Sequence, residues 1–347
     1  MANQSESKRT EIAELGEFGL IDRIKKDAKI HHASTLKGIG DDAAVIKGEK
    51  ELTVISTDML VEGVHFDLRY APLKHLGFKA IAVNVSDIAA MNAIPKQVTV
   101  SIAFSNRFSV EAIDELYRGI NLACEEYNVD LVGGDTTSSN VGLIISITAV
   151  GTVEEDKITY RNTAQKGDVI CVSGDLGAAY LGLNILEREK QEFLANPNME
   201  PQLDGKNYLI ERQLKPSARM DVVYELREKG VVPTAMMDIS DGLASELLHI
   251  CSQSDLGVVI YEDRLPIDRM TVDVATTDFN ITPSVCALNG GEDYELLFTV
   301  KQEDFAKIEN LPDITPIGYT TEASKGRKFV TRGQQVVDIT AQGWKHF

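Results

Sequence analysis

The order of strand-like and helix-like segments constrains the fold of this chain more than any other feature. Short runs rich in β-branched residues alternate with longer runs whose apolar residues recur at three- and four-residue spacing. In the first part, strands are expected at 52–57, 97–104 and 142–153, and helices at 73–91 and 109–127. This alternation predicts an α/β fold.

The alternation restarts after residue 166, which indicates a second domain. We place the boundary near residue 155 and predict domains 1–155 and 156–347, which agrees with the length of 347 residues. The polar stretch 190–207 is expected to be a surface loop. In the second domain we expect strands at 168–174, 234–240, 256–263, 294–300 and 315–320, and helices at 176–190, 217–230 and 241–254.

The charge balance argues against some partners. There are 53 acidic and 35 basic residues, for a net charge of -18, so nucleic acid and anionic membranes are poor candidates. Phosphates could still bind if metal ions lay between them and the protein. No run is apolar enough to span a bilayer and the polar start lacks a signal-peptide core, so we expect a cytoplasmic protein. Cys124, Cys171, Cys251 and Cys286 are dispersed, which is typical of small buried hydrophobes.

Acidic residues repeatedly follow an apolar strand or a glycine turn, often beside Ser, Thr or Gly. We expect Ser56, Thr57 and Asp58 to lie where the strand beginning at Leu52 ends. Any one of these acids alone has a structural explanation as a helix cap or turn residue, and Asp241 before an apolar helix is an example. The set comprises Asp41, Asp42, Ser56, Thr57, Asp58, Asp87, Asp135, Asp238, Ser240, Asp241, Glu292 and Asp293.

Carboxylates gathered at one place repel one another unless cations neutralise them. Oxygen ligands of this kind suit Mg²⁺, which binds one or two carboxylates and completes its shell with waters and substrate phosphates. Glycine-rich segments at 38–40, 133–134 and 290–291 would let the backbone approach a phosphate. The sequence contains neither a Walker loop nor a protein-kinase signature. We therefore predict a magnesium and nucleotide site outside both common kinase architectures.

Three basic or titratable residues lie close to these segments in the sequence. Arg161 and Lys79 could each reach a phosphate, although a solvated position on a helix face is the more common role for a residue such as Lys79. His65 follows Asp58 by seven residues and could line the same site, but a lone His is more often a packing residue.

Seven motifs, in order and spacing, resemble those of the thiamine-monophosphate kinase family. They are GEFGLI, GIGDDAAV, STDMLVEGVHF, KAIAVNVSDIAAM, LVGGDTT, MDISDGL and GGEDYELLF, and the resemblance runs from about residue 16 to the C-terminus. It implies the two-domain fold of aminoimidazole ribonucleotide synthetase, with mixed sheets and a homodimer whose N-terminal sheets pack together. It also implies the ATP-dependent phosphorylation of thiamine monophosphate to thiamine diphosphate, the last step of thiamine diphosphate biosynthesis.

The resemblance assigns roles to individual positions. It implies several Mg²⁺ ions, and ATP contacts at Gly134, Asp135, Arg161 and Ser240. Thiamine monophosphate would contact His65, Glu292 and Trp344, although a lone Trp near a C-terminus can equally be a packing residue. The implied magnesium ligands are Asp42, Ser56, Thr57, Asp58, Asp87, Asp135, Asp238 and Asp241.

The acceptor is already an ionised phosphate, so we predict direct in-line transfer without a protein acid or base, and a positioning role for His65. Selenophosphate synthetase normally carries a reactive Cys or selenocysteine in its N-terminal segment, whereas this chain has no Cys before Cys124. The hydrogenase-maturation dehydratase ends in Cys, and this chain ends in Phe347. Aminoimidazole ribonucleotide synthetase lacks the pairing of STDMLVEGVHF with GGEDYELLF. The non-enzyme alternative is a magnesium–nucleotide sensor that binds ATP without turnover.

Overall fold

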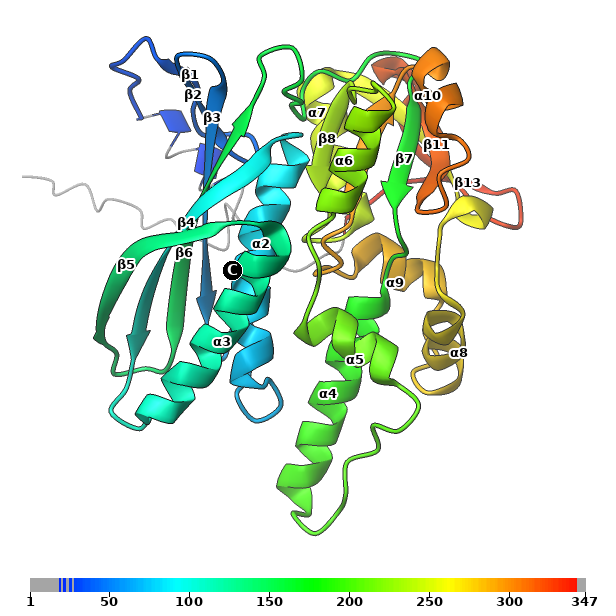
Figure 1. Ribbon diagram of the computed structural model, residues 1–347. Coiled ribbons are helices and arrows are strands. Elements are labelled where there is room, and N and C mark those ends of the chain that lie inside the picture. The colour runs from blue at the N-terminus through cyan, green and yellow to red at the C-terminus, as the bar shows by residue number, and fades with distance from the viewer. Residues whose placement is uncertain (1–18, 20, 23–24, 27, 342–347) are drawn as a thin grey trace, which may run out of the picture.

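The computed structural model describes residues 19, 21–22, 25–26 and 28–341. Two mixed sheets lie side by side with helices between them and around the second (Figure 1). The first sheet has the order β1-β2-β3-β6-β4-β5, with all neighbours antiparallel except β4 and β5. Its strands are β1 (Thr35–Lys37), β2 (Ala44–Lys47), β3 (Leu52–Val61), β4 (Ile94–Phe104), β5 (Asp130–Ser138) and β6 (Ile144–Val153).

The second sheet has the order β13-β12-β9-β11-β7-β10-β8, and in it only β12 and β9 are parallel. Its strands are β7 (Val169–Ser173), β8 (Ala235–Asp238), β9 (Leu256–Tyr261), β10 (Leu296–Val300), β11 (Ile314–Glu322), β12 (Arg327–Val330) and β13 (Val336–Asp338). The α/β architecture with mixed sheets is therefore confirmed.

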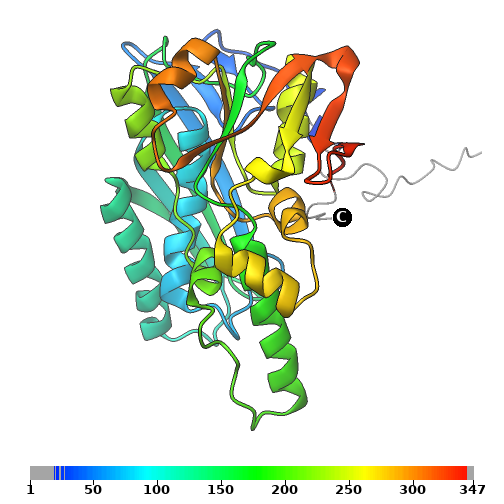
Figure 2. The same cartoon turned by 90° about the vertical axis from the view of Figure 1, so that its right-hand side faces the viewer.

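The helices of the second half surround its sheet, and α4 projects away from the rest (Figure 2). They are α4 (Ala178–Ala195), α5 (Asn207–Leu214), α6 (Met220–Glu228), α7 (Leu243–Ser254), α8 (Arg269–Thr277), α9 (Pro283–Asn289) and α10 (Gln302–Ile308), with 3-10 turns at Glu262–Arg264 and Ala323–Lys325. Because α4 continues to Ala195, the expected loop at 190–207 begins later than predicted.

Helices α2 (Leu73–Ala90) and α3 (Val110–Tyr127) cover one face of the first sheet. They approach closely because each has a glycine at the crossing. A Cβ on Gly77 would lie 2.0 Å from the Leu116 carbonyl oxygen, and one on Gly119 would lie 1.8 Å from that of Lys74. Helix α3 begins at a Ser109 cap, whose hydroxyl accepts from the Ala112 N–H.

Helix α2 is buried on nearly all sides, since the first sheet and α3 pack against it and β8 of the second sheet also contacts it. A helix in such a position is expected to be apolar all round. Most of α2 follows this rule, but Lys79, Asn84, Ser86 and Asp87 are polar. Each of these four side chains therefore needs a partner within the protein.

The opposite face of the first sheet is open. The side chains of Thr57 and Met59 on β3 and of Thr99 and Ser101 on β4 are exposed there, and nearly every residue of β5 is exposed. Met59 is 54% exposed, although it lies in the middle of the sheet. This polar and partly apolar face is where a second copy could pack in the expected homodimer.

Two sequence predictions, one on the cysteines and one on membrane-spanning segments, can be compared with the fold. All four cysteines are buried and free, as expected. None of the helices in the described part of the chain combines the length and the apolar character that a bilayer crossing requires.

Candidate active site

A large cleft lies between the two halves of the molecule. Its volume is about 1890 Å³, and its walls come from β2, β3 and α2 of the first half and from α4, α7 and the segment before β10 of the second. Pockets for one small ligand are typically about 300–1,000 Å³. The cleft therefore has room for more than one small ligand.

Three carboxylates meet on one wall of the cleft. Asp42 precedes β2, Asp87 lies in the last turn of α2 and Asp238 ends β8, and one oxygen of each lies within 4.8 Å of the others. Asp58 of β3 adds a fourth carboxylate, whose charge acts on Asp87. Four of the predicted magnesium ligands, separated by up to 196 positions in the sequence, are thus brought together.

Neighbouring hydroxyl and guanidinium groups hold these carboxylates in place. Ser56 donates to Asp87, and the Ser86 hydroxyl donates to Asp238 Oδ2 at 2.6 Å. Arg161 binds both oxygens of Asp42, at 2.5 Å from Nη2 to Oδ1 and 3.1 Å from Nε to Oδ2. The adjacent Asp41 forms ion pairs with Lys37, at 2.9 Å, and with Arg161, at 3.5 Å.

Burial dominates the electrostatics of the cluster. It raises the pKa of Asp42 to about 7 against the opposing effect of Arg161, and it raises that of Asp238 to about 6. The pKa of Asp87 is raised well above its ordinary value by burial and then by the charges of Asp58, Asp238 and Asp42. Ionising the cluster at neutral pH is costly unless a cation is present, so the donor set fits a divalent metal ion.

The length of strand β3 corrects one expectation. Ser56, Thr57 and Asp58 do not follow the end of a strand, because β3 continues to Val61. Alternation along β3 directs Ser56 and Asp58 toward α2, where the Asp58 N–H donates to the Asn84 amide oxygen at 3.0 Å. The Thr57 side chain lies on the open face and donates to the Ile147 carbonyl.

Gly134 and Asp135 also lie apart from the cluster. Asp135 is on the edge strand β5, in register with Ser101 of β4, which pairs with Ser146 of β6 and through it with Met59 of β3. Three strand spacings, about 14 Å, therefore separate Asp135 from β3 within one chain. Gly134 has a packing reason of its own, because a Cβ there would lie 1.8 Å from the Val100 carbonyl oxygen.

The turn between β8 and α7 contributes Ser240 and Asp241 to the cleft. The N-cap of α7 is Gly242, so the interpretation of Asp241 as the helix cap is wrong. The Asp241 N–H instead donates to Glu246 Oε1 at 2.8 Å. Glu246 is buried, lines the cleft and was missed in the sequence, and its Oε2 has no hydrogen-bond partner among the described residues.

His65, Glu292, Tyr70 and Tyr180 also line the cleft. His65 Nδ1 accepts from the Val61 N–H at 3.0 Å. Glu292 has a positive φ of 67° and is paired with Lys79. The expectation of a solvated Lys79 is wrong, because its side chain is buried and its ammonium group contacts Gln213 and Glu292. Trp344 lies outside the described residues.

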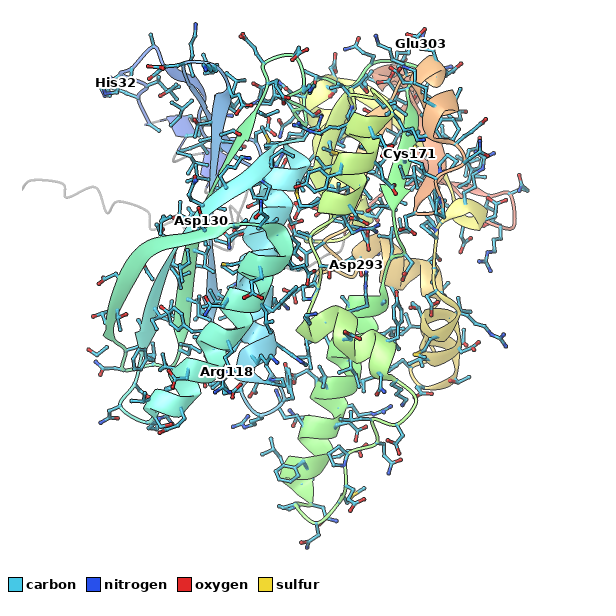
Figure 3. The ribbon with its side chains drawn as sticks, in the orientation of Figure 1. His32, Arg118, Asp130, Cys171, Asp293 and Glu303 are labelled. Atoms are coloured by element: carbon cyan, nitrogen blue, oxygen red, sulfur yellow. The ribbon has the colours of Figure 1, made fainter. Side chains whose placement is uncertain are left out.

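The acids that follow Glu292 serve the fold. Asp293 accepts from the Gly177 N–H at 2.8 Å, at the start of α4 (Figure 3). Glu295 is buried and pairs with Arg212 at 2.7 Å and Arg219 at 2.5 Å. Neither acid lines the cleft. The motif GGEDYELLF therefore combines three cleft residues, Gly291, Glu292 and Tyr294, with two structural acids.

Family models match both halves of the chain. The AIR synthase related protein N-terminal domain matches residues 40–153, and the corresponding C-terminal domain matches residues 165–330. Thiamine-monophosphate kinase of Bacillus subtilis (strain 168) is 35% identical over 343 residues, covering 96% of this chain and 100% of that protein. The Aquifex aeolicus (strain VF5) protein of the same name is 36% identical, covering 97% and 99%.

Solved structures agree. AaThiL complexed with AMPPCP and TMP aligns with a TM-score of 0.83 and 35% identity, covering 98% of this chain and 100% of that one. Thiamine monophosphate kinase from Aquifex aeolicus aligns with a TM-score of 0.77 and 34% identity, covering 95% and 100%. The resemblance expected from the motifs is confirmed: the chain belongs to the thiamine-monophosphate kinase family and has its two-domain AIR synthase related fold.

Proposed function

We propose that this protein phosphorylates thiamine monophosphate to thiamine diphosphate with ATP. The observation that carries the proposal is the buried carboxylate cluster, which lies in a cleft large enough for two phosphorylated ligands. The family relationship supports it, because the relative AaThiL was solved in complex with AMPPCP and TMP. Both substrates are polyanions, and a wall of carboxylates can bind them only through cations.

We assign Mg²⁺ to the cluster. Asp42, Asp58, Asp87 and Asp238, with Ser56, would hold it from one chain, and Asp241 would extend the site toward α7. Bound Mg²⁺ would offset the repulsion between donor and acceptor phosphates and act as a Lewis acid. Arg161 stays close to Asp42 and provides a cation at the edge of the cluster, where we expect a nucleotide phosphate.

A homodimer would explain Thr57 and Asp135. Both side chains lie on the open face of the first sheet, about three strands apart. A second copy packed against that face could bring its own Gly134 and Asp135 toward Thr57, and would bury Met59 at the same time. We propose that residues 1–155 supply this interface and most metal ligands, and that residues 156–347 complete the site.

The residues around His65 and Glu292 suit the acceptor. The thiazolium ring of thiamine is cationic, so a carboxylate and aromatic rings favour it, and Glu292, Tyr70 and Tyr180 line the cleft. Because the acceptor phosphate is already ionised, we propose direct in-line transfer in which His65 orients substrate and no side chain removes a proton. We also propose that the reaction takes place in the cytoplasm.

One assay tests the activity. The protein is incubated with ATP, Mg²⁺ and thiamine monophosphate, and thiamine diphosphate is measured by chromatography. Thiamine without phosphate serves as the acceptor control. We expect a diphosphate product that depends on Mg²⁺. ATP binding without turnover of thiamine monophosphate would refute the kinase and favour the nucleotide sensor.

A further inference from the structure

Lys79 is an unusual residue for the middle of a buried helix. Its side chain is only 4% exposed, and its neighbours along α2, Phe78 and Ala80, are also buried. The ammonium group donates to the Gln213 backbone carbonyl at 3.1 Å and to Glu292 Oε2. The pair joins α2 of the first half to the segment before β10 of the second, 213 positions away.

A gain in stability is a weak explanation for this lysine. Removing the Lys79 charge from water costs about as much as its attraction to Glu292 returns, and a well-packed apolar residue often serves a buried position at least as well. Lys79 is buried, whereas the Glu292 side chain is 25% exposed at the cleft, so the pair fixes the position of a carboxylate that a ligand can still reach.

The geometry set here is that of Glu292. One of its oxygens, Oε2, accepts from both Lys79 and the Gln213 side-chain amide, the latter at 2.8 Å. The other, Oε1, receives only a long 3.5 Å contact from the Tyr294 hydroxyl among the described residues. Because Glu292 lines the cleft, the two donors occupy one oxygen and leave the other for a ligand.

We propose that Lys79, with Gln213, is a positioning residue that orients the Glu292 carboxylate toward the thiamine moiety of the acceptor. The inference rests on the proposed function. The position of Lys79 on helix α2 has a further consequence. Lys79 and Asp87 lie eight residues apart on this helix, about 12 Å along its axis. One rigid element thereby sets the spacing between the acceptor's ring and the metal cluster that receives its phosphate.

The test compares Lys79→Met, Glu292→Gln and the double variant with the wild type. Met keeps most of the volume of the lysine stem and removes the charge. Lys74→Met is the matched control, because Lys74 is on the same helix but is exposed. Steady-state kinetics give KM separately for thiamine monophosphate and for ATP, and thermal unfolding is recorded for each protein.

We expect Lys79→Met to raise the KM for thiamine monophosphate by about tenfold or more, with the KM for ATP changed by less than about twofold. The double variant should be no worse than Glu292→Gln alone, because Lys79 acts through Glu292. Lys74→Met should match the wild type.

Two results would overturn the inference. One is a Lys79→Met enzyme with reduced kcat or melting temperature but unchanged KM for both substrates, which is the signature of a structural role. The other is a double variant whose KM defects multiply. A wild type that does not phosphorylate thiamine monophosphate would instead refute the proposed function, so the two failures are distinguishable.

Discussion

Replacing Asp238 by Asn should make the metal-free protein more stable. Asp238 is buried at the end of β8, and burial raises its pKa from 3.8 to about 6. Asn has the same shape and can still accept the hydrogen bond that Ser86 donates to Asp238. The substitution therefore removes the charge and changes the packing little.

The size of the effect follows from the pKa. Because the folded state binds this proton more tightly than the unfolded state, the carboxylate destabilises the fold as the pH rises from 3.8 to about 6. Each pKa unit corresponds to about 1.4 kcal/mol, so the variant should gain up to about 3 kcal/mol in free energy of unfolding near pH 8. Near pH 5 the gain should be about half as large.

Urea denaturation followed by circular dichroism measures this gain, with a chelator present and then with Mg²⁺. Mg²⁺ should stabilise the wild type more than the variant, because a ligand that binds only the folded state stabilises it more at a given concentration when its affinity is higher. The reasoning fails if the metal-free variant is less stable than the wild type near pH 8, or if its gain does not shrink toward pH 5.

Three further predictions concern activity and assembly. Asp87→Asn should abolish turnover and leave the circular dichroism spectrum unchanged, because it removes a central carboxylate of the cluster; near wild-type kcat at saturating Mg²⁺ would exclude Asp87 from the metal site. Light scattering should give the mass of a dimer, and a monomer mass would contradict this. If each site combines Thr57 and Asp135 from different copies, a mixture of inactive Thr57→Val and Asp135→Asn proteins should regain about a quarter of wild-type activity. No regain of activity after subunit exchange would contradict the shared site. Thiamine monophosphate with Mg²⁺ should change the fluorescence of Trp344, and Trp344→Ala should raise the KM for thiamine monophosphate far more than that for ATP; lost stability with an unchanged KM would make Trp344 a packing residue.

Periodicity located most strands and helices, because the apolar spacing of each segment reflects which of its faces is buried. It failed at β3. Ser56 and Asp58 resemble the end of a strand when only neighbours in sequence are considered. In the fold they are inner-face residues of a strand that continues to Val61, and their partners Asp87 and Asn84 come from α2. Those contacts depend on tertiary structure, which local pattern does not encode.

Lys79 shows a different limit. Its helix was predicted from residue 73 to 91, but the interpretation of Lys79 assumed that one face of the helix meets water. The apolar residues of this segment surround the helix, which indicates burial on all sides and could have shown that its polar residues have partners. The identity of those partners, Gln213 and Glu292, still required the packing of the second half against the first.

The polar residues of α2 connect binding to the assembly of the two halves. Ser86 reaches Asp238 and Lys79 reaches Glu292, so the helix of the first half contacts the second half through residues of the site itself. Buried polar contacts of this kind are costly when they are incomplete. Without a cation the carboxylate cluster is electrostatically unfavourable, and it lies at the contact between the halves. Metal binding should therefore strengthen the association of the two halves as well as prepare the site for phosphates.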